Sequence, residues 1–439
     1  MKELKNLMKE FGIVGAGGAG FPSYAKLAEG ADLLLINGSE CEPLLYTDYV
    51  ILKNELTLVL IGITKVLEHT GIPKSLLAIK AHTAKRLGMA EGEKLTDKIF
   101  IKVLPDVYPI GDEVGLIYEA TGRLVSPGSL PITQGVIVYN VETMYNLGRG
   151  IRFSEPVTEK YLTVGGDIKC PTVVKVPVGT KVADIFKKLG IELDDGYTVL
   201  DGGPSMGKII NPNTYAVSKT TKGILILPDD TQAVLSKKMN EKMAIARAET
   251  ACCQCTRCTD LCPRNLLGYP LEPHKMVRTA MGAAEVMPEM VLSATLCCGC
   301  GICESHACSQ GISPRAVIAN YKELLAKNKL RFNLKGEYSV KPEREYRMVP
   351  SEKWMSMLGV RRLDRLADFG GEIKTFERVE IPLSRHIGVP SIPVVKDGDF
   401  VTEGDLIAKA AEGLSLPQHA SLSGIVTLGI DKIIIDKVR

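Results

Sequence analysis

The sequence predicts a chain of several domains, of mixed α/β and α+β class, and three observations support this prediction. Its 439 residues suffice for roughly three domains of the usual ~100–200 residues, and 45% apolar with 24% charged residues is an ordinary globular composition. Two quartets of cysteines lie between residues 252 and 308. After Arg152, and again after Val379, the pattern changes to short strands.

The first 152 residues alternate helical and strand patterns. An amphipathic helix is predicted at 2–11, the glycine-rich stretch GIVGAGGAGFP follows at 12–22, and the apolar strand candidate ADLLLIN comes at 31–37. Three of the glycines satisfy G-x-G-x-x-G, but a dinucleotide fingerprint follows a strand and opens a helix. A glycine run lets the backbone approach a flat ring or a phosphate. A purely structural turn is the alternative interpretation.

Short strand patterns surround one helix pattern at 153–235. YLTVGGDI, TVVKVPVG, YTVLDGGPSMGKII and GILILPDD indicate strands, and KVADIFKKLGI indicates a helix. This order predicts a β-grasp unit. The stretch GGPSMG at 202–207 is interpreted as a hairpin turn, with a ligand-binding loop as the alternative.

Cysteines crowd into CCQCTRCTDLC at 252–262, with Pro263 next. The spacing C-x2-C-x2-C-x3-C-P is that of bacterial ferredoxins, which bind 4Fe–4S clusters, and the second quartet has C-x2-C-x2-C-x4-C. A ferredoxin-like segment with two 4Fe–4S clusters is therefore predicted at 236–330. The predicted ligands are Cys252, Cys255, Cys258, Cys262, Cys297, Cys300, Cys303 and Cys308.

In two-cluster ferredoxins the fourth cysteine of each run serves the other cluster. Cys308 is therefore expected with the first three cysteines of the first run, and Cys262 with the first three of the second run. Zinc is the alternative metal, because C-x2-C pairs also form zinc sites.

The residues around the quartets predict helices and inert side chains. Residues 271–295 have helical spacing, which indicates a helix pair connecting the two cysteine loops. Cys41 and Cys170 stand alone and are expected to be buried, unreactive thiols. His274 and His306 are interpreted as solvated or capping residues, with tuning of a cluster or proton relay as the alternative.

Two further segments complete the chain. Residues 331–375 are mixed in charge and predict a connector carrying a strand or two. From residue 376 to 439, short strands separated by DG, EG and SG turns resemble a lipoyl-type barrel-sandwich hybrid. Such carriers need a modified lysine at a hairpin tip, but LSLPQHAS at 414–421 has none. No covalently carried cofactor is therefore expected.

Composition argues against two classes of partner. The net charge is only +3, a single Trp is present, and no basic tract is interleaved with aromatics, so nucleic acid is not expected. No segment approaches the ~18 apolar residues of a membrane helix, and the N-terminus lacks the apolar run of a signal peptide. We expect a cytoplasmic protein without a membrane span.

Four motifs resemble, in order and approximate spacing, the flavin-carrying subunit of respiratory complex I and the C subunit of the Rnf electron-transport complex. They are GAGGAGFPSYAK at 15–26, NGSECEP at 37–43, YPIGDE at 108–113 and NVETMYN at 140–146. The resemblance implies an FMN/NADH-binding α/β domain at 1–152. The residues it implies for the flavin pocket are Gly15, Gly17, Gly18, Lys26, Asn37, Glu40, Tyr108, Gly111, Asp112, Glu113, Asn140 and Thr143, with Phe21 and Glu42 facing the nicotinamide nucleotide.

The sequence departs from the complex I pattern at a few positions. Ser39 and Cys41 replace an acidic residue and a serine, and Glu29 stands near where a second nucleotide-stacking aromatic is expected. These changes affect the predicted binding of NADH more than that of FMN. A flavin accepts a hydride pair and releases single electrons, which is the conversion that an iron–sulfur relay requires.

The order of modules narrows the resemblance. The β-grasp segment is similar to the soluble-ligand-binding (SLBB) module of the same family, and the hybrid is similar to one that precedes the flavin domain in the Rnf protein. Here the hybrid ends the chain, an order that looks like the cobalamin reductases of propanediol-utilisation microcompartments. His386 and His419, in corresponding loops of the hybrid, are interpreted as structural, with axial ligation of a corrin as the alternative.

This resemblance implies an NADH-dependent oxidoreductase that passes electrons to an oxidised corrinoid, cob(III)alamin or cob(II)alamin, in the cytoplasm or inside a bacterial microcompartment. One alternative is a peripheral Rnf-type subunit that links NADH and ferredoxin. Another is a microcompartment scaffold or relay protein with a degenerate flavin site.

Overall fold

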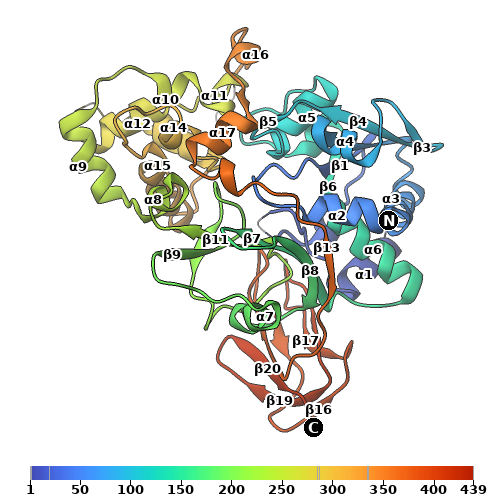
Figure 1. Ribbon diagram of the computed structural model, residues 1–439. Helices are drawn as coiled ribbons and strands as arrows, with labels where there is room; N and C mark the ends of the chain where they lie inside the picture. The colour runs from blue at the N-terminus through green and yellow to red at the C-terminus, as the bar shows by residue number, and fades with distance from the viewer. Residues whose placement is uncertain (1, 19, 284, 286, 334–335, 439) are drawn as a thin grey trace.

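The computed structural model describes residues 2–18, 20–283, 285, 287–333 and 336–438, so position 19 of the glycine-rich stretch and positions 284 and 286 of the predicted helix pair lie outside it. The first module and the cysteine module lie side by side, the β-grasp module lies below both, and the C-terminal hybrid is at the far end (Figure 1). Among the described residues, every helix is too short or too polar to cross a membrane.

A five-stranded sheet with the order β3-β4-β2-β1-β6 forms the centre of the first module. Its strands are β1 (Leu33–Gly38), β2 (Lys74–Lys80), β3 (Lys94–Thr96), β4 (Ile99–Leu104) and β6 (Val136–Asn140). All pairs are parallel except that of β3 with β4. The inner strands are nearly continuous apolar runs, because helices cover both faces. The strand predicted at 31–37 is therefore confirmed, and the glycines precede it.

Helices pack on both faces of this sheet. α1 (Lys2–Glu10), α2 (Thr47–Asn54), α3 (Leu56–Thr70) and α6 (Val141–Phe153) share one apolar core, and α5 (Glu113–Thr121) covers the other face. The backbones of α3 and α6 touch where they cross. A Cβ on Gly62 would lie 2.1 Å from the carbonyl oxygen of Met144, and a Cβ on Gly148 would lie 2.0 Å from that of Leu58. This crossing requires glycine in both helices.

The second module has the β-grasp arrangement predicted for it. Its elements are the hairpin β7 (Glu159–Gly166) and β8 (Thr172–Pro177), then α7 (Val182–Leu189), β9 (Tyr197–Asp201), β10 (Lys208–Ile210) and β11 (Gly223–Pro228). β11 returns parallel to β7, in a sheet with the order β10-β9-β11-β7-β8-β13. The expected burial of Cys170 is wrong: it is exposed, because it lies in the turn of the β7–β8 hairpin, beyond the packed part of the sheet.

Short helices build the cysteine module. They are α8 (Gln232–Lys238), α9 (Glu241–Ala251), α10 (Arg257–Asp260), α11 (Pro263–Leu266), α12 (Pro273–Ala280), α13 (Pro288–Leu292), α14 (Ile302–Ser305) and α15 (Pro314–Lys327). Proline stands at the first position of α11, α12, α13 and α15, where its missing N–H costs no helical hydrogen bond. The predicted helix pair between the quartets is confirmed as α12 and α13.

The predicted connector contributes strands to two other modules. β12 (Val349–Pro350) pairs with β5 (Val107–Tyr108) of the first module, and β13 (Phe369–Glu372) extends the β-grasp sheet beside β8. Between them, α17 (Ser351–Met357) buries Trp354 completely. The connector therefore packs as an integral part of the molecule from Val349 onward.

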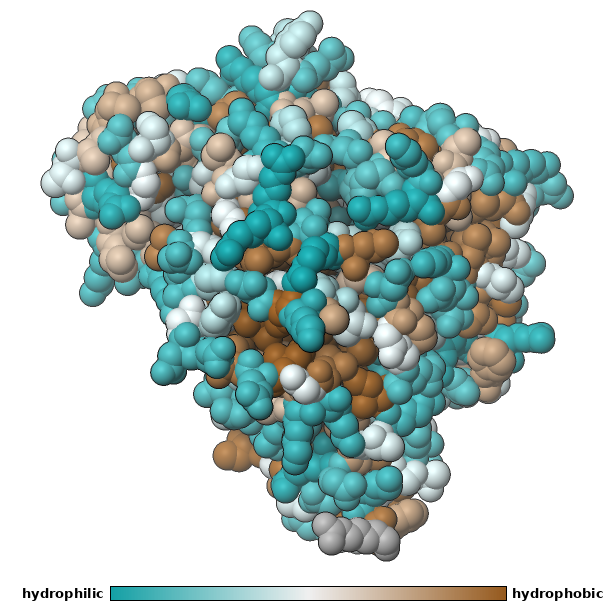
Figure 2. All heavy atoms as spheres, in the orientation of Figure 1, coloured by the Kyte–Doolittle hydropathy of each residue, from teal (hydrophilic) through white to brown (hydrophobic). Residues whose placement is uncertain are grey.

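Two small facing sheets form the C-terminal hybrid. One contains β14 (Arg378–Pro382), β20 (Lys432–Asp436), β19 (Gly424–Leu428) and β16 (Phe400–Val401), and the other contains β15 (Ile392–Pro393), β17 (Leu406–Lys409) and β18 (Gln418–His419). An aliphatic core lies between them. The face of the molecule drawn in Figure 2 shows apolar side chains gathered over the β-grasp sheet, above this hybrid.

We predict that Gly148→Ala lowers the free energy of unfolding by about 1–3 kcal/mol, because the added methyl group collides with the carbonyl oxygen of Leu58. Gly115→Ala in α5 is the matched control, since its Cβ would meet only Asp112 Oδ2, at 3.9 Å. Thermal unfolding of both variants checks the prediction, and equal melting temperatures would contradict it.

Candidate flavin and iron–sulfur site

The four resembling motifs converge at the carboxyl ends of β1 and β6, the edge where parallel sheets bind ligands. Asn140 donates its Nδ2 to the carbonyl oxygen of Asn37 at 3.0 Å, and Asn37 donates its Nδ2 to that of Gly111 at 3.0 Å. Lys26 Nζ lies 2.7 Å from the Glu113 carboxylate. Residues up to about a hundred positions apart thus share one edge of the sheet.

The glycine loop lies against the same edge. The Gly15 N–H donates to the carbonyl oxygen of Phe21 at 2.8 Å, which closes the loop, and the Ala16 N–H donates to Thr143 Oγ1 at 3.1 Å. A Cβ on Gly17 would lie 2.9 Å from the side chain of Asn140, whereas a Cβ on Gly18 would meet nothing within 4 Å. One side of the loop is therefore packed and the other open, an arrangement that fits a flat ligand such as FMN.

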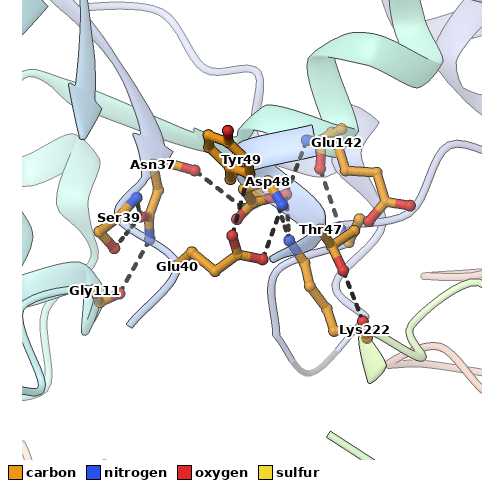
Figure 3. A network of polar contacts seen from close by, with 12 residues as sticks. Asn37, Ser39, Glu40, Thr47, Asp48, Tyr49, Gly111, Glu142 and Lys222 are labelled. Carbon is orange, nitrogen blue, oxygen red and sulfur yellow. Dashed lines mark hydrogen bonds and ion pairs between the residues drawn. The ribbon is translucent and has the colours of Figure 1, made fainter. Parts of the chain in front are cut away.

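A polar network fixes this edge to the β-grasp module (Figure 3). Glu40 accepts the backbone N–H groups of Asp48 and Tyr49 at 2.9 and 3.1 Å, at the start of α2. Asp48 also accepts Asn140 Nδ2 at 3.0 Å and forms an ion pair with Lys222. Burial, and then the nearby charge of Asp48, raise the pKa of Glu40 to about 7. The Glu40 side chain is therefore part of this buried network, where it holds the start of α2.

Two lysines of the β-grasp module belong to this network, and sequence reasoning missed both. Lys222 precedes β11, and Lys160 on β7 forms a fully buried ion pair with Glu142 of α6. Burial lowers the pKa of Lys160 and raises that of Glu142. Nothing local in the sequence marks these lysines, since their partners lie in another module.

Glu42 and Tyr108 contact the β-grasp module and the cysteine module. Glu42 accepts the N–H groups of Ser205 and Met206 at 2.9 and 3.2 Å, and Tyr108 donates its hydroxyl to the carbonyl oxygen of Cys300 at 2.9 Å. A Cβ on Gly203 would lie 2.1 Å from the Glu42 carboxylate. The 202–207 loop is thus a β9–β10 turn, as interpreted, and its glycine makes room for Glu42. The nicotinamide-facing role of Glu42 stays a prediction.

Asp112 links the same pocket to the cysteine module. Its carboxylate lies 2.7 Å from Arg264 on α11, two residues after Cys262. Although burial opposes it, the negative charge of Asp112 raises the pKa of Arg264. This ion pair therefore holds the predicted flavin pocket against a predicted cluster ligand.

The neighbours that shift the pKa of each thiol divide the predicted ligand cysteines into an outer and an inner set. Burial raises the pKa of Cys258 to about 12, and the charges of Cys308, Cys255 and Cys252 beside it add to the rise. These four residues are the outer set, in which Cys255 is exposed.

The inner set joins Cys262 to the second run. Burial raises the pKa of Cys262 to about 12, and the charges of Cys297 and Cys298 add to the rise. Burial also raises the pKa of Cys303, and the charges of Glu304, Cys297, Cys262 and Cys258 add to the rise. The inner set is Cys262, Cys297, Cys300 and Cys303, of which Cys262, Cys300 and Cys303 are buried. This grouping agrees with the exchanged pairing expected from the ferredoxin spacing, and that pairing stays a prediction.

Crowded, buried thiols hold their protons unless a metal removes them, so the donor sets fit iron–sulfur clusters. Within the described part of the chain, no three Cys, His, Asp or Glu side chains are arranged to hold a single metal ion. The assignment of each cysteine as a ligand stays a prediction.

The outer edge of the glycine loop is held by the β-grasp and C-terminal modules together. Lys219 donates its Nζ to the carbonyl oxygens of Gly12 and Pro417 at 3.1 and 3.2 Å, and the Ile387 N–H donates to that of Gly20 at 3.0 Å. Burial lowers the pKa of Lys219 to about 7, and burial together with the Lys219 charge lowers the pKa of His419 to about 3. The hybrid therefore serves as a support for the loop.

The remaining histidines lie near the modules where they were expected. His274 Nδ1 is hydrogen-bonded to Thr259 Oγ1 at 2.6 Å, and His386 Nε2 contacts the carbonyl oxygen of Val389 at 3.0 Å. Nδ1 of His306, His386 and His419 has no hydrogen-bond partner among the described residues. The structural role interpreted for His386 and His419 stays a prediction.

Comparison with known families matches three of the four modules. Residues 8–149 match the Nuo51 FMN-binding domain, residues 251–313 match a 4Fe-4S dicluster domain, and residues 371–437 match the RnfC barrel sandwich hybrid domain. Together with the fold, these matches define the class: a multidomain oxidoreductase with an FMN-binding domain and a 4Fe–4S dicluster domain.

Similar proteins identify the family within this class of oxidoreductases. The chain is 36% identical to "Cobalamin reductase PduS" of Salmonella typhimurium, over 97% of this chain and 94% of that protein, and 35% identical to the protein of the same name from Citrobacter freundii, with the same coverage. It therefore belongs to the family of PduS cobalamin reductases. It is also 30% identical to the C subunit of the proton-translocating ferredoxin:NAD(+) oxidoreductase complex of Clostridium ljungdahlii, over 61% of this chain and 57% of that protein.

We predict that Lys219→Met removes a pH dependence of stability. Burial holds the pKa of Lys219 at about 7 in the folded chain, against 10.5 when exposed. The unfolded protein therefore binds more protons between pH ~7 and ~10, so wild-type stability should gain up to about 1.4 kcal/mol per pH unit relative to the variant. Melting temperatures of both proteins from pH ~7 to ~9 check this, and parallel curves would contradict it.

Proposed function

We propose that this chain takes electrons from NADH on FMN and passes them singly through two 4Fe–4S clusters to an oxidised corrinoid, cob(III)alamin or cob(II)alamin. Membership in the cobalamin reductase family supports the acceptor, and the matched FMN and dicluster domains support the relay. When bound, FMN would supply the conversion of a hydride pair into single electrons. The family resemblance also supports a cytoplasmic protein that resides in a microcompartment.

The residues that would hold FMN are those gathered at the carboxyl edge of the first sheet. The glycine loop would lie against the ring system with its open side at Gly18, and Asn37, Asn140 and Thr143 hold that loop and edge in place through their own hydrogen bonds. Asp48 and Lys222 neutralise each other behind the edge. The chain thus offers a preformed surface, which lowers the entropic cost of binding.

One observation carries the proposal: one predicted pocket residue contacts the inner cysteine set directly, and a second is linked to it through Arg264. Tyr108 donates to the carbonyl oxygen of Cys300 at 2.9 Å, and Asp112 pairs with Arg264 at 2.7 Å, two residues from Cys262. The inner set therefore lies next to the pocket, while the outer set has the exposed Cys255. Electrons would pass from the pocket to the inner cluster, then to the outer cluster, and leave there.

A second function is favoured by the similarity to the Clostridium ljungdahlii protein of the ferredoxin:NAD(+) oxidoreductase complex, which extends over 61% of this chain. In that case the same relay would exchange electrons with ferredoxin as a peripheral component of a larger complex. The hypothesis differs from the first only in the partner at the outer cluster.

An anaerobic reconstitution tests both. The protein is loaded with iron, sulfide and FMN, NADH is added, and the bleaching of flavin and clusters is followed with and without hydroxocobalamin or oxidised ferredoxin. Bleaching by NADH and repeated reoxidation by cobalamin would support the proposal. Reoxidation by ferredoxin alone would support the second function, and no bleaching at all would refute NADH as the donor.

We predict that Gly17→Val loses FMN but keeps all its iron. The new side chain would collide with Asn140, which stands 2.9 Å from the Cβ position, whereas the cysteines lie in another module. Flavin and iron content of the purified variant check this. Retention of FMN with normal affinity would refute the glycine-loop assignment.

We predict that Cys258→Ala and Cys308→Ala remove the same cluster. The double variant C258A/C308A should therefore keep half of the iron and sulfide, because both residues belong to the outer set, whereas C258A/C262A should lose both clusters. NADH should still reduce the flavin in C258A/C308A. Iron content and the electron paramagnetic resonance of the reduced proteins decide, and total loss of iron from C258A/C308A would contradict the exchanged pairing.

A further inference from the structure

The only tryptophan of the chain is completely buried where three modules meet. Trp354, from the predicted connector, packs in one apolar cluster with Tyr108 of the first module, Leu200 of the β-grasp module and Cys300 of the cysteine module. Its ring stacks on Tyr108 with centroids 4.7 Å apart and an interplanar angle of 8°. Trp354 is neither a predicted cofactor contact nor a predicted cluster ligand, yet it stacks on Tyr108, a predicted pocket residue, and shares an apolar cluster with Cys300, a predicted ligand.

Trp354 also holds the β-grasp loop that covers Glu42. Its Nε1–H donates to Ser205 Oγ at 2.9 Å, and the Ser205 N–H in turn donates to Glu42 at 2.9 Å. The carbonyl oxygen of Ser205 accepts Arg315 of the cysteine module at 2.7 Å. Ser205 thus ties Trp354 both to the predicted pocket and to the helix that follows the second quartet.

Tyr108 completes the junction on its other side. Its hydroxyl reaches the backbone of Cys300, in the inner cysteine set, at 2.9 Å. Its backbone pairs in register with Val349 of β12, five residues before Trp354. The aromatic pair is therefore fixed at both ends, through the strand pairing and through the cysteine loop.

We propose that Trp354 is a positioning residue that clamps the flavin-binding edge against the inner cysteine loop, and so sets the distance over which an electron crosses. The inference rests on the proposed function. One electron moves from the reduced flavin to the oxidised inner cluster in each crossing, and Trp354 itself gains and loses none. After two such crossings the reoxidised flavin has also released one proton to solvent.

Rates of two successive steps separate this role from a general loss of structure. In stopped-flow reduction of the loaded protein by NADH, Trp354→Leu should reduce its flavin at the wild-type rate but its clusters several-fold more slowly, because the rate of electron transfer falls exponentially as the distance between donor and acceptor grows. Trp354→Phe keeps a ring for stacking, so its rate of cluster reduction should lie between those of the wild type and Trp354→Leu. Ser205→Ala removes the acceptor of Nε1–H but leaves the aromatic stacking, so it should slow cluster reduction less than Trp354→Leu does.

Controls are available in the same segment. Tyr346→Leu removes an aromatic side chain that is 88% exposed on the connector and should change neither rate. Dithionite should reduce the clusters of every variant fully, which shows that the clusters are intact. Since Trp354 is the only tryptophan, its fluorescence in the flavin-free wild type should be quenched when FMN is added.

Wild-type cluster reduction in a Trp354→Leu protein with full flavin and iron would overturn the proposal. If that variant does not fold or bind its cofactors, wild-type cluster reduction in both Trp354→Phe and Ser205→Ala would overturn it instead. If NADH fails to reduce even the wild-type flavin, the donor is wrong. Photoreduction of the flavin with EDTA then replaces NADH, and the same comparison of cluster rates decides the role of Trp354.

Discussion

The buried ion pair of Asp48 and Lys222 is the interaction on which the candidate site depends. A charge removed from water is costly unless a counter-charge and hydrogen bonds replace the solvent. Asp48 meets this condition with Lys222 from the β-grasp module and Asn140 from the end of β6, while its own N–H is held by Glu40. These contacts fix three parts together: the start of α2, the carboxyl edge of the sheet and the β-grasp module. If one of them moved, a buried charge would lose its partner.

Contacts between modules also explain why the hybrid can follow the flavin and cysteine modules in the sequence. The hybrid contributes a few contacts to the glycine loop. Ile387 donates to the loop directly, and Lys219 of the β-grasp module bridges Pro417 of the hybrid and Gly12 of the loop. Such contacts depend on where the module packs and do not depend on its position in the sequence. A support built in this way tolerates a rearrangement of module order, provided that the surfaces meet.

The proposed relay depends on packing between modules. Cysteine spacing predicts two sets of ligands, but it does not say which set faces the flavin-binding edge. That is decided by Asp112 with Arg264, by Tyr108 with Cys300, and by the loop around Ser205, all of which bring the inner set to the edge and leave the outer set nearer solvent. In the proposed relay, buried polar groups that must find partners would thereby set the direction in which electrons move.

Much of this was determined by the sequence alone. Apolar and glycine patterns are local, so they predicted the strand after the glycine loop, the β-grasp order, the helix pair and the hybrid. Closely spaced cysteines predict cluster loops for the same reason, since a short turn must bring its thiols to one metal centre. The exposure of Cys170 was predicted wrongly, because the local sequence of a hairpin turn does not show whether another module covers it.

Only the tertiary structure decided which distant side chains meet. Lys222, Arg264 and Trp354 find their partners more than a hundred residues away, in other modules. A pairing of that kind leaves no period or spacing in the sequence, and a charged or aromatic residue in a mixed segment looks like surface until its partner is known. The sequence therefore determined the modules and their chemistry, while packing and the pairing of buried charges determined how the modules are joined.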